Sequence, residues 1–131
     1  MMTDPIADFL IQIKNSYMAR KSSVSIPYSQ IKENLASVLG KSGYIGKVEV
    51  KKEGKVKRTL SIMLNYKNKK PVLSEIKIVS KSGKRVYVGK NMIPKVLGGL
   101  GKVMMSTSSG IMTGDDARKK GLGGEIICKI W

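Results

Sequence analysis

The spacing of apolar residues changes along this chain, and the change limits the folds that it can adopt. Near the N-terminus, apolar residues recur at helical spacing, at Ile6, Phe9, Leu10, Ile13 and Tyr17. Asp4 can cap this helix, and Pro5 suits its first position. A second helical run begins after Ser29, another capping residue, and leads toward Gly43. From Val48 onward apolar residues mostly alternate with polar ones, as in strands with one buried face. The pattern predicts a mixed α/β fold of the α+β kind.

Several strands and one further helix are expected. Val24 and Ile26 alternate with serines between the two helices, and Glu53-Gly54-Lys55 supplies the turn of a hairpin. Alternating runs follow in the second half at residues 76–78 and 86–88, and further strands are expected at 103–105 and 125–131. Between the last two, Thr113 and Asp116 match a capping box, and Gly121 can end that short helix. The second half is therefore expected to be β-rich.

One polar segment is the best candidate for a domain boundary. Residues 67–71 are positively charged and end in Pro71, as linkers often do. We therefore expect a small mixed α/β N-terminal domain over residues 1–66, a linker over 67–71 and a β-rich C-terminal domain over 72–131. A chain of 131 residues is long enough for one or two small packed units.

The charge of the chain indicates the kind of partner. The sequence has 25 Lys and Arg against 9 Asp and Glu, a formal net charge of +16. Up to Tyr66 there are 11 basic and 5 acidic residues, and beyond it 14 and 4, so the two halves carry +6 and +10. This balance favours a polyanion such as nucleic acid, and it favours the second half as the stronger phosphate binder. A soluble protein with a solvated lysine surface is the alternative.

Catalysis and metal binding are poorly supported by the residue types. The chain has no His and a single cysteine, Cys128, so the usual general base, an internal disulfide and the usual metal quartet are all missing. Ser29 and Lys32 match an S-x-x-K pattern, but its companion elements are absent and Ser29 is better explained as a helix cap. No nucleotide-binding glycine loop and no membrane-spanning apolar run occur. We expect no enzyme activity, cofactor, small-molecule substrate or membrane partner, and a cytoplasmic location.

Two groups of residues could recognise a nucleic acid. The hydroxyls of Ser106, Thr107, Ser108 and Ser109 can meet base edges, 2′-hydroxyls and phosphates, and Gly110 allows close approach. A polar turn with local hydrogen bonds would give the same pattern.

Arg85 and Tyr87 form the second group, because they share one face of their strand. Tyr87 could stack on an unpaired base, or it could be an ordinary exposed aromatic residue. Gly123 and Gly124 could serve turn geometry or allow close approach of RNA.

A family resemblance rests on these residues and on others that span almost the whole chain. The matching segments are Thr3-Asp4-Pro5-Ile6-Ala7-Asp8 with Ile13 and Asn15, Gly43-Tyr44-Ile45, Ser106-Thr107-Ser108, Gly110-Ile111-Met112-Thr113, Ala117-Arg118 and Gly121-Leu122-Gly123-Gly124-Glu125. In these segments the chain resembles the bacterial type of small-subunit ribosomal protein eight. Ser109, where many relatives carry a basic residue, and Gly114-Asp115 depart from the family pattern.

The resemblance implies a structural protein that binds the central domain of small-subunit ribosomal RNA and helps to organise platform assembly. It assigns contacts with an irregular RNA helix to residues of the C-terminal domain, namely Arg85, Tyr87, Ser106, Thr107, Ser108, Ser109, Gly110, Gly123, Gly124 and Glu125. Thr3, Asp4 and Asn15 would touch a second RNA helix. The implied partners also include small-subunit ribosomal proteins five and twelve and, in many bacteria, the messenger of the protein's own operon.

Two other functions remain alternatives at this stage. A different basic nucleic-acid module, such as a DNA-organising protein, would bind duplex DNA as tightly as structured RNA at equal salt. An RNA-processing enzyme would show turnover, and the missing histidines argue against it.

Overall fold

The computed structural model describes residues 4–131, which contain both helices and antiparallel sheets. The mixed α/β class expected from the sequence is therefore confirmed. The chain divides into two compact units. We call Asp8–Leu73 the N-terminal unit, and Ser74–Trp131 together with Met1–Ala7 the C-terminal unit.

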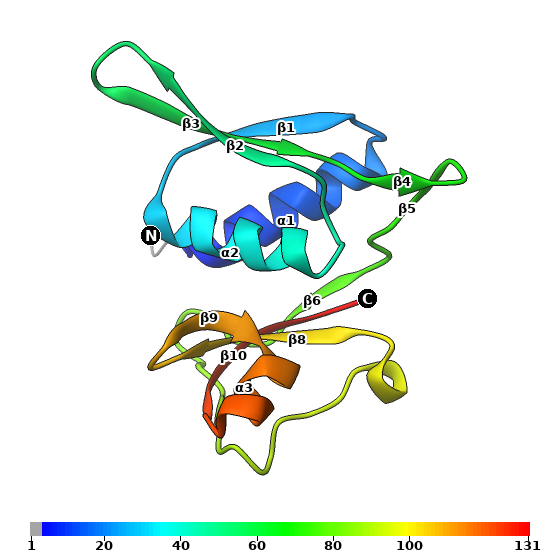
Figure 1. Ribbon diagram of the computed structural model, residues 1–131, viewed down its shortest axis with the longest axis vertical. Coiled ribbons are helices and arrows are strands. Elements are labelled where there is room, and N and C mark those ends of the chain that lie inside the picture. The colour runs from blue at the N-terminus through cyan, green and yellow to red at the C-terminus, as the bar shows by residue number, and fades with distance from the viewer. Residues whose placement is uncertain (1–3) are drawn as a thin grey trace. The chain divides into compact units, whose positions relative to one another are not determined.

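The N-terminal unit places two helices against one face of a three-stranded antiparallel sheet (Figure 1). Its helices are α1 (Pro5–Met18), of which the residues from Asp8 onward belong to this unit, and α2 (Gln30–Lys41). Its main strands, β1 (Ser23–Pro27), β2 (Val48–Glu53) and β3 (Lys57–Met63), lie in the order β1-β3-β2. The predicted hairpin is thus β2–β3.

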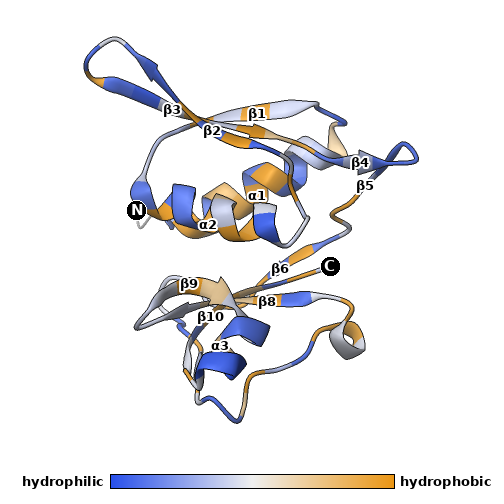
Figure 2. Ribbon diagram, in the orientation of Figure 1, coloured by the Kyte–Doolittle hydropathy of each residue, from blue (hydrophilic) through white to orange (hydrophobic). Residues whose placement is uncertain are grey.

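The core of this unit consists of apolar residues of the predicted helices and strands. Fully or almost fully buried side chains come from both helices and two strands, namely Phe9, Leu10, Ile13, Ile26, Leu35, Leu39, Leu60 and Ile62. Figure 2 shows hydrophobic residues along both helices. Ser29 caps α2 as predicted, because its side chain accepts a hydrogen bond from the Lys32 amide.

The buried Tyr17 connects three segments of the same unit. Its hydroxyl donates to the Tyr44 carbonyl at 2.6 Å and accepts from the Asn65 amide at 3.0 Å. Its ring meets that of Tyr66 edge-on, with ring centroids 5.5 Å apart. Burial raises the pKa of the Tyr17 hydroxyl, and the neutral hydroxyl has partners for both its proton and an oxygen lone pair.

Residues 67–71, expected to be a linker, form most of a small hairpin. Its strands are β4 (Tyr66–Lys67) and β5 (Lys70–Pro71), and Asn68 and Lys69 at the turn have φ angles of 53° and 63°. A tight polar turn has the same composition as a linker, so the sequence does not separate the two. In the structure the division between the two units lies between Leu73 and Ser74. The domains 1–66 and 72–131 and the linker between them stay a prediction.

The C-terminal unit is β-rich, with the last strand at the centre of its sheet. Its elements are β6 (Ile76–Ile78), β7 (Tyr87–Val88), a 3-10 turn (Leu97–Gly99), β8 (Lys102–Thr107), β9 (Gly110–Thr113), α3 (Gly114–Lys120) and β10 (Gly124–Ile130). The strand order is β6-β10-β8-β9, and β7 also pairs with β10. The strand β9 was not predicted, because only four residues separate the serine-rich turn from the helix.

The caps of α3 agree with the sequence prediction. The Thr113 hydroxyl accepts from the Asp116 amide at 3.2 Å, and Gly121 ends the helix in the left-handed conformation, at φ 68° and ψ 35°. In the sheet of the C-terminal unit, a cluster of buried side chains lies on one face of strands β8, β9 and β10, namely Ile93, Val96, Val103, Met105, Met112, Ala117 and Ile126.

Candidate nucleic-acid interface

A row of paired residues crosses four strands of the C-terminal unit. Tyr87 of β7 pairs with Glu125 of β10, Glu125 pairs with Ser106 of β8, and Ser106 pairs with Ile111 of β9. Residues that pair directly in antiparallel strands point to the same face. The next residue of the central strand, Ile126, belongs to the buried cluster on the other face. The row therefore lies on the face opposite that cluster, and Tyr87 is 69% exposed there.

Arg85 joins this row through its guanidinium. Its Nη1 lies 3.5 Å from Glu125 Oε2 and 3.8 Å from Asp4 Oδ2, so two carboxylates share one cation. Arg85 is exposed, and exposed ion pairs add little stability. The pairing instead holds Arg85 near Glu125, the residue opposite Tyr87. The structure thus brings Arg85, Tyr87, Glu125 and Ser106 together.

The serine-rich segment forms the turn of the β8–β9 hairpin. Thr107 pairs with Gly110, which leaves Ser108 and Ser109 exposed at the tip. Gly110 has a φ angle of 108°, which an L-residue with a side chain rarely adopts. The glycine at this position is therefore explained by the backbone of the turn.

The hydroxyl of Thr107 is occupied within this turn. Its Oγ1 donates to the Gly110 carbonyl at 2.9 Å, accepts from the Ser109 amide at 3.2 Å and lies 3.9 Å from the Met112 sulfur. The polar-turn alternative therefore describes Thr107 well. Within residues 4–131, the hydroxyls of Ser106, Ser108 and Ser109 make no hydrogen bond, so both their donor and their acceptor capacity is available.

The two glycines before Glu125 are explained by close approach between strands. A Cβ on Gly124 would lie 2.3 Å from the Ser106 carbonyl oxygen, and one on Gly123 would lie 2.5 Å from the Val88 carbonyl oxygen. Neither neighbour is a flexible side chain, so a substitution would push the strands apart. The sequence left two roles open for these glycines, backbone geometry and close approach of RNA. The structure supports the role in backbone geometry and does not test the approach of RNA.

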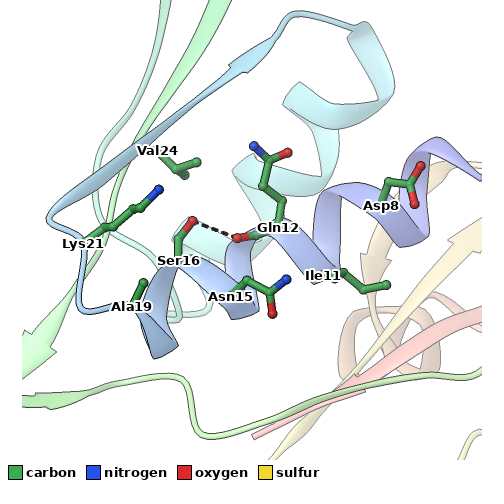
Figure 3. Close-up of a pocket in the computed structure, with 8 residues that line it drawn as sticks. All are labelled: Asp8, Ile11, Gln12, Asn15, Ser16, Ala19, Lys21 and Val24. Atoms are coloured by element: carbon green, nitrogen blue, oxygen red, sulfur yellow. Dashed lines mark hydrogen bonds between the residues drawn. The ribbon is translucent and has the colours of Figure 1, made fainter.

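The remaining predicted contacts lie near the N-terminus. Thr3 lies outside the described residues. Asp4 caps α1, since its Oδ1 accepts from the Ala7 amide at 3.2 Å. Asn15 is exposed on α1 in the N-terminal unit, where it lines a surface hollow of about 400 Å³. Figure 3 shows Asn15 and Gln12 beside this hollow, with Lys21 on its other side.

Comparison with known proteins identifies the family. A model of the family described as ribosomal protein S8 matches residues 4–131. The chain belongs to the ribosomal protein S8 family. A relative from Dictyoglomus turgidum is 51% identical over 99% of this chain and 98% of its own length. Relatives from Solibacter usitatus and Syntrophomonas wolfei are 47% and 49% identical, over 100% of this chain and 100% and 99% of their own lengths. Each of the three is named small ribosomal subunit protein uS8.

Membership of the S8 family confirms the resemblance found in the sequence, including its bacterial type. The family is one of structural ribosomal proteins and not of enzymes. Among residues 4–131, no group of three or more His, Cys, Asp or Glu side chains could hold a metal ion, and no helix is both long and apolar enough to cross a membrane.

Cys128 is a core residue. Its side chain is fully buried in β10, and burial raises the pKa of the thiol to about 12. At neutral pH the thiol is therefore protonated and unreactive, because the thiolate is the nucleophilic form.

One ion-pair network was not predicted from the sequence. Asp115 accepts from Lys102 at 2.8 Å and from Arg118 at 2.6 Å, and these cations hold the pKa of its carboxyl below the usual value. Arg118 also donates to the Ile93 and Pro94 carbonyls, at 3.4 and 3.0 Å. Arg118 thus ties α3 to the preceding loop, and part of its capacity to bind a phosphate is already used. A charge count along the sequence does not reveal such pairing.

Proposed function

We propose that this chain is a component of the small ribosomal subunit that binds ribosomal RNA as a primary assembly protein. The proposal names the central domain of the small-subunit RNA as its target and organisation of the platform as its role. Membership of the S8 family, the names of the relatives and the net charge of +16 support it. The observation that carries it is the row of residues across β7, β10, β8 and β9.

In this proposal the exposed face of the row recognises an irregular RNA helix. Ser106, Ser108 and Ser109 offer unoccupied hydroxyls, which both donate to and accept from base edges and 2′-hydroxyls. Tyr87 offers an exposed ring on which an unpaired base can stack. Arg85 supplies a cation, and Glu125 both positions Arg85 and accepts from a base amino group.

Backbone geometry supports this surface from within. Thr107 and Gly110 hold the turn closed, and Gly123 and Gly124 let β10 approach its neighbours closely. These four residues would then shape the RNA surface more than they touch RNA.

The proposal extends to a second RNA helix and to protein partners. Thr3, Asp4 and Asn15 would contact that helix, with small-subunit ribosomal proteins five and twelve as neighbours in the assembled particle. Binding to the messenger of the protein's own operon would use the same exposed face, if that messenger carries a matching hairpin. The proposal includes no catalysis, cofactor or small-molecule substrate.

The test is crosslinking in cells, followed by sequencing of the RNA bound to the full-length chain. Reads concentrated in the central domain of small-subunit ribosomal RNA would support the proposal. Reads spread over unrelated RNA, or equal binding of duplex DNA at the same salt in a purified system, would support a general nucleic-acid module instead. Turnover of bound RNA would support a processing enzyme.

A further inference from the structure

The outer end of the β2–β3 hairpin is a basic arm, which we define as residues 51–58. Their sequence, Lys-Lys-Glu-Gly-Lys-Val-Lys-Arg, contains five basic residues and one acidic residue, so eight residues carry a net charge of +4. All eight are exposed.

The arm extends past the third strand of its sheet. The pairing of β1 with β3 ends at Pro27 and Thr59, whereas β2 and β3 continue to pair as far as Glu53 and Lys57. Beyond the end of the pairing between β1 and β3, one backbone bond, from the Tyr28 amide to the Arg58 carbonyl at 3.2 Å, joins the hairpin to the residue that follows β1. Figure 1 shows the hairpin continuing beyond β1, and Figure 2 shows its outer part coloured mainly as hydrophilic.

The register of the hairpin puts positive charge on both faces of the arm. Lys52 pairs with Arg58 and therefore shares a face with it, while Lys51 lies on the opposite face. Lys57 pairs with Glu53 on that second face. A ribbon charged on one face alone would suit a flat polyanionic surface. A ribbon charged on both suits a position between two anionic chains.

Little of this charge is neutralised by the protein itself. Within residues 4–131, Lys51, Lys52 and Lys55 form no ion pair. Lys57 lies 3.9 Å from Glu53, but both side chains are largely exposed, so the interaction is weak. Arg58 lies over the Tyr28 ring at 4.2 Å, which orients the guanidinium without removing its charge.

The composition of the arm argues against a protein as its partner. The buried centre of a protein interface is poor in Lys and Glu and rich in aromatic residues. The arm has only one large apolar residue, Val56, which is 94% exposed at the turn. Phosphates, by contrast, attract lysine side chains as point charges and need no apolar contact.

We propose that the basic arm is a second RNA-binding element, which inserts between two phosphate backbones of structured ribosomal RNA. This proposal rests on the proposed function of the chain, and it adds a contact in the N-terminal unit to the recognition face of the C-terminal unit. The arm neutralises phosphates and does not read bases, because its lysines carry no base-specific geometry. It therefore contributes affinity and salt dependence, while the C-terminal unit contributes specificity.

A tethered cleavage probe tests where the arm lies. The chain has one cysteine, Cys128, which is buried with a thiol pKa of about 12, so Val56→Cys supplies a single reactive thiol at the arm's turn. An iron chelate attached there should cleave small-subunit ribosomal RNA at two nearby backbone segments. The same probe on Ser109→Cys should cleave different nucleotides. Absence of cleavage from position 56 in a bound complex would overturn the proposal.

A matched pair of triple variants of the full chain tests the energetics. Lys51→Gln/Lys52→Gln/Lys55→Gln removes three charges from the arm, and Lys67→Gln/Lys69→Gln/Lys70→Gln removes three from the β4–β5 hairpin of the same unit. The arm variant should lose roughly a hundredfold in affinity near 0.15 M salt, and its plot of log affinity against log salt should be less steep by about one unit per lysine. An equal loss of RNA affinity in both variants, or no loss in the arm variant, would overturn the proposed role of the arm.

The wild-type chain separates this result from the proposed function. If it shows no preference for ribosomal RNA over duplex DNA, the proposed function is wrong whatever the arm does. If it shows that preference and the arm variant binds with unchanged affinity and slope, only the arm proposal is wrong.

Discussion

Thr107 and Ser108 are neighbours, but the Thr107 hydroxyl is hydrogen-bonded within the turn and, among the described residues, the Ser108 hydroxyl is not. Single substitutions should therefore separate their roles. Thr107→Ala removes the bond to the Gly110 carbonyl and the bond from the Ser109 amide. Each such bond contributes about 0.5–1.5 kcal/mol, and the low end applies because the groups left behind are exposed to water. The expected loss in the free energy of unfolding is therefore about 1 kcal/mol. For a unit of this size, that lowers the melting temperature by about 4–8 °C.

Ser108→Ala should behave in the opposite way. The Ser108 hydroxyl makes no bond within the described residues, so stability should change by less than about 0.5 kcal/mol. If the hydroxyl pairs with an RNA group that binding buries, its loss should cost about 1–3 kcal/mol, or roughly five- to 150-fold in affinity. The slope of affinity against salt should not change, because no charge is lost.

Both quantities should be measured on the same samples, melting by calorimetry and binding by titration of a central-domain RNA fragment. Thr107→Ser is the matched control, since it keeps the hydroxyl and should keep the turn. Full RNA affinity in Ser108→Ala would refute recognition by the tip of the hairpin. An unchanged melting temperature in Thr107→Ala would refute the structural role of that hydroxyl.

Three further substitutions test other parts of the structure. Gly124→Ala should destabilise the C-terminal unit by about 1–3 kcal/mol, because the added Cβ would lie 2.3 Å from the Ser106 carbonyl oxygen. An unchanged midpoint of denaturation would contradict this close approach. Tyr17→Phe should cost about 1–3 kcal/mol, as measured by urea unfolding, because the buried Tyr44 carbonyl and the part-buried Asn65 amide each lose their partner. Asp115→Asn should cost less than about 1 kcal/mol at neutral pH. The difference from the wild type should shrink in acid, as pH falls through the lowered pKa of the carboxyl, and a difference that does not shrink as pH falls would exclude this cause.

The sequence predicted those elements whose cause is local. The apolar period of α1, the Ser29 cap of α2 and the Gly121 end of α3 each depend on residues a few positions apart. Strand β9 was missed because it is short and becomes a strand only by pairing with β8. The β4–β5 hairpin was missed because its polar turn has the composition of a linker.

The candidate site was predictable as a set of residues but not as an arrangement. Tyr87, Glu125 and Ser106 come from three separate segments, and only the register of the sheet puts them in one row. The same register explains Gly124 as a residue that packs against a strand. For Thr107 the sequence left two roles open, and the structure supports the role in the turn through a hydrogen bond that composition alone cannot predict.

The distribution of charge shows why a count over half of the sequence is a weak guide to RNA affinity. By that count the second half of the chain, at +10, should contribute more to RNA affinity than the first half, at +6. Yet in the C-terminal unit Arg85, Lys102 and Arg118 each face a carboxylate, which reduces the charge that they offer to phosphates. In the N-terminal unit, the arm gathers a net +4 within eight exposed residues.

Attraction to a polyanion depends on the local density of unpaired charge, because salt screens charges that lie more than about 8–10 Å away. Under our proposal, the two units therefore contribute to RNA binding in a different proportion from their net charges. In our proposal, the hydroxyls and the tyrosine ring of the C-terminal unit distinguish one RNA surface from another, at a modest electrostatic gain. The arm presents charge without base-reading geometry, so under the same proposal it would strengthen whichever complex the C-terminal unit has selected. Removing the arm should then weaken binding to correct and incorrect RNAs by similar factors, whereas Ser108→Ala should reduce the ratio between them.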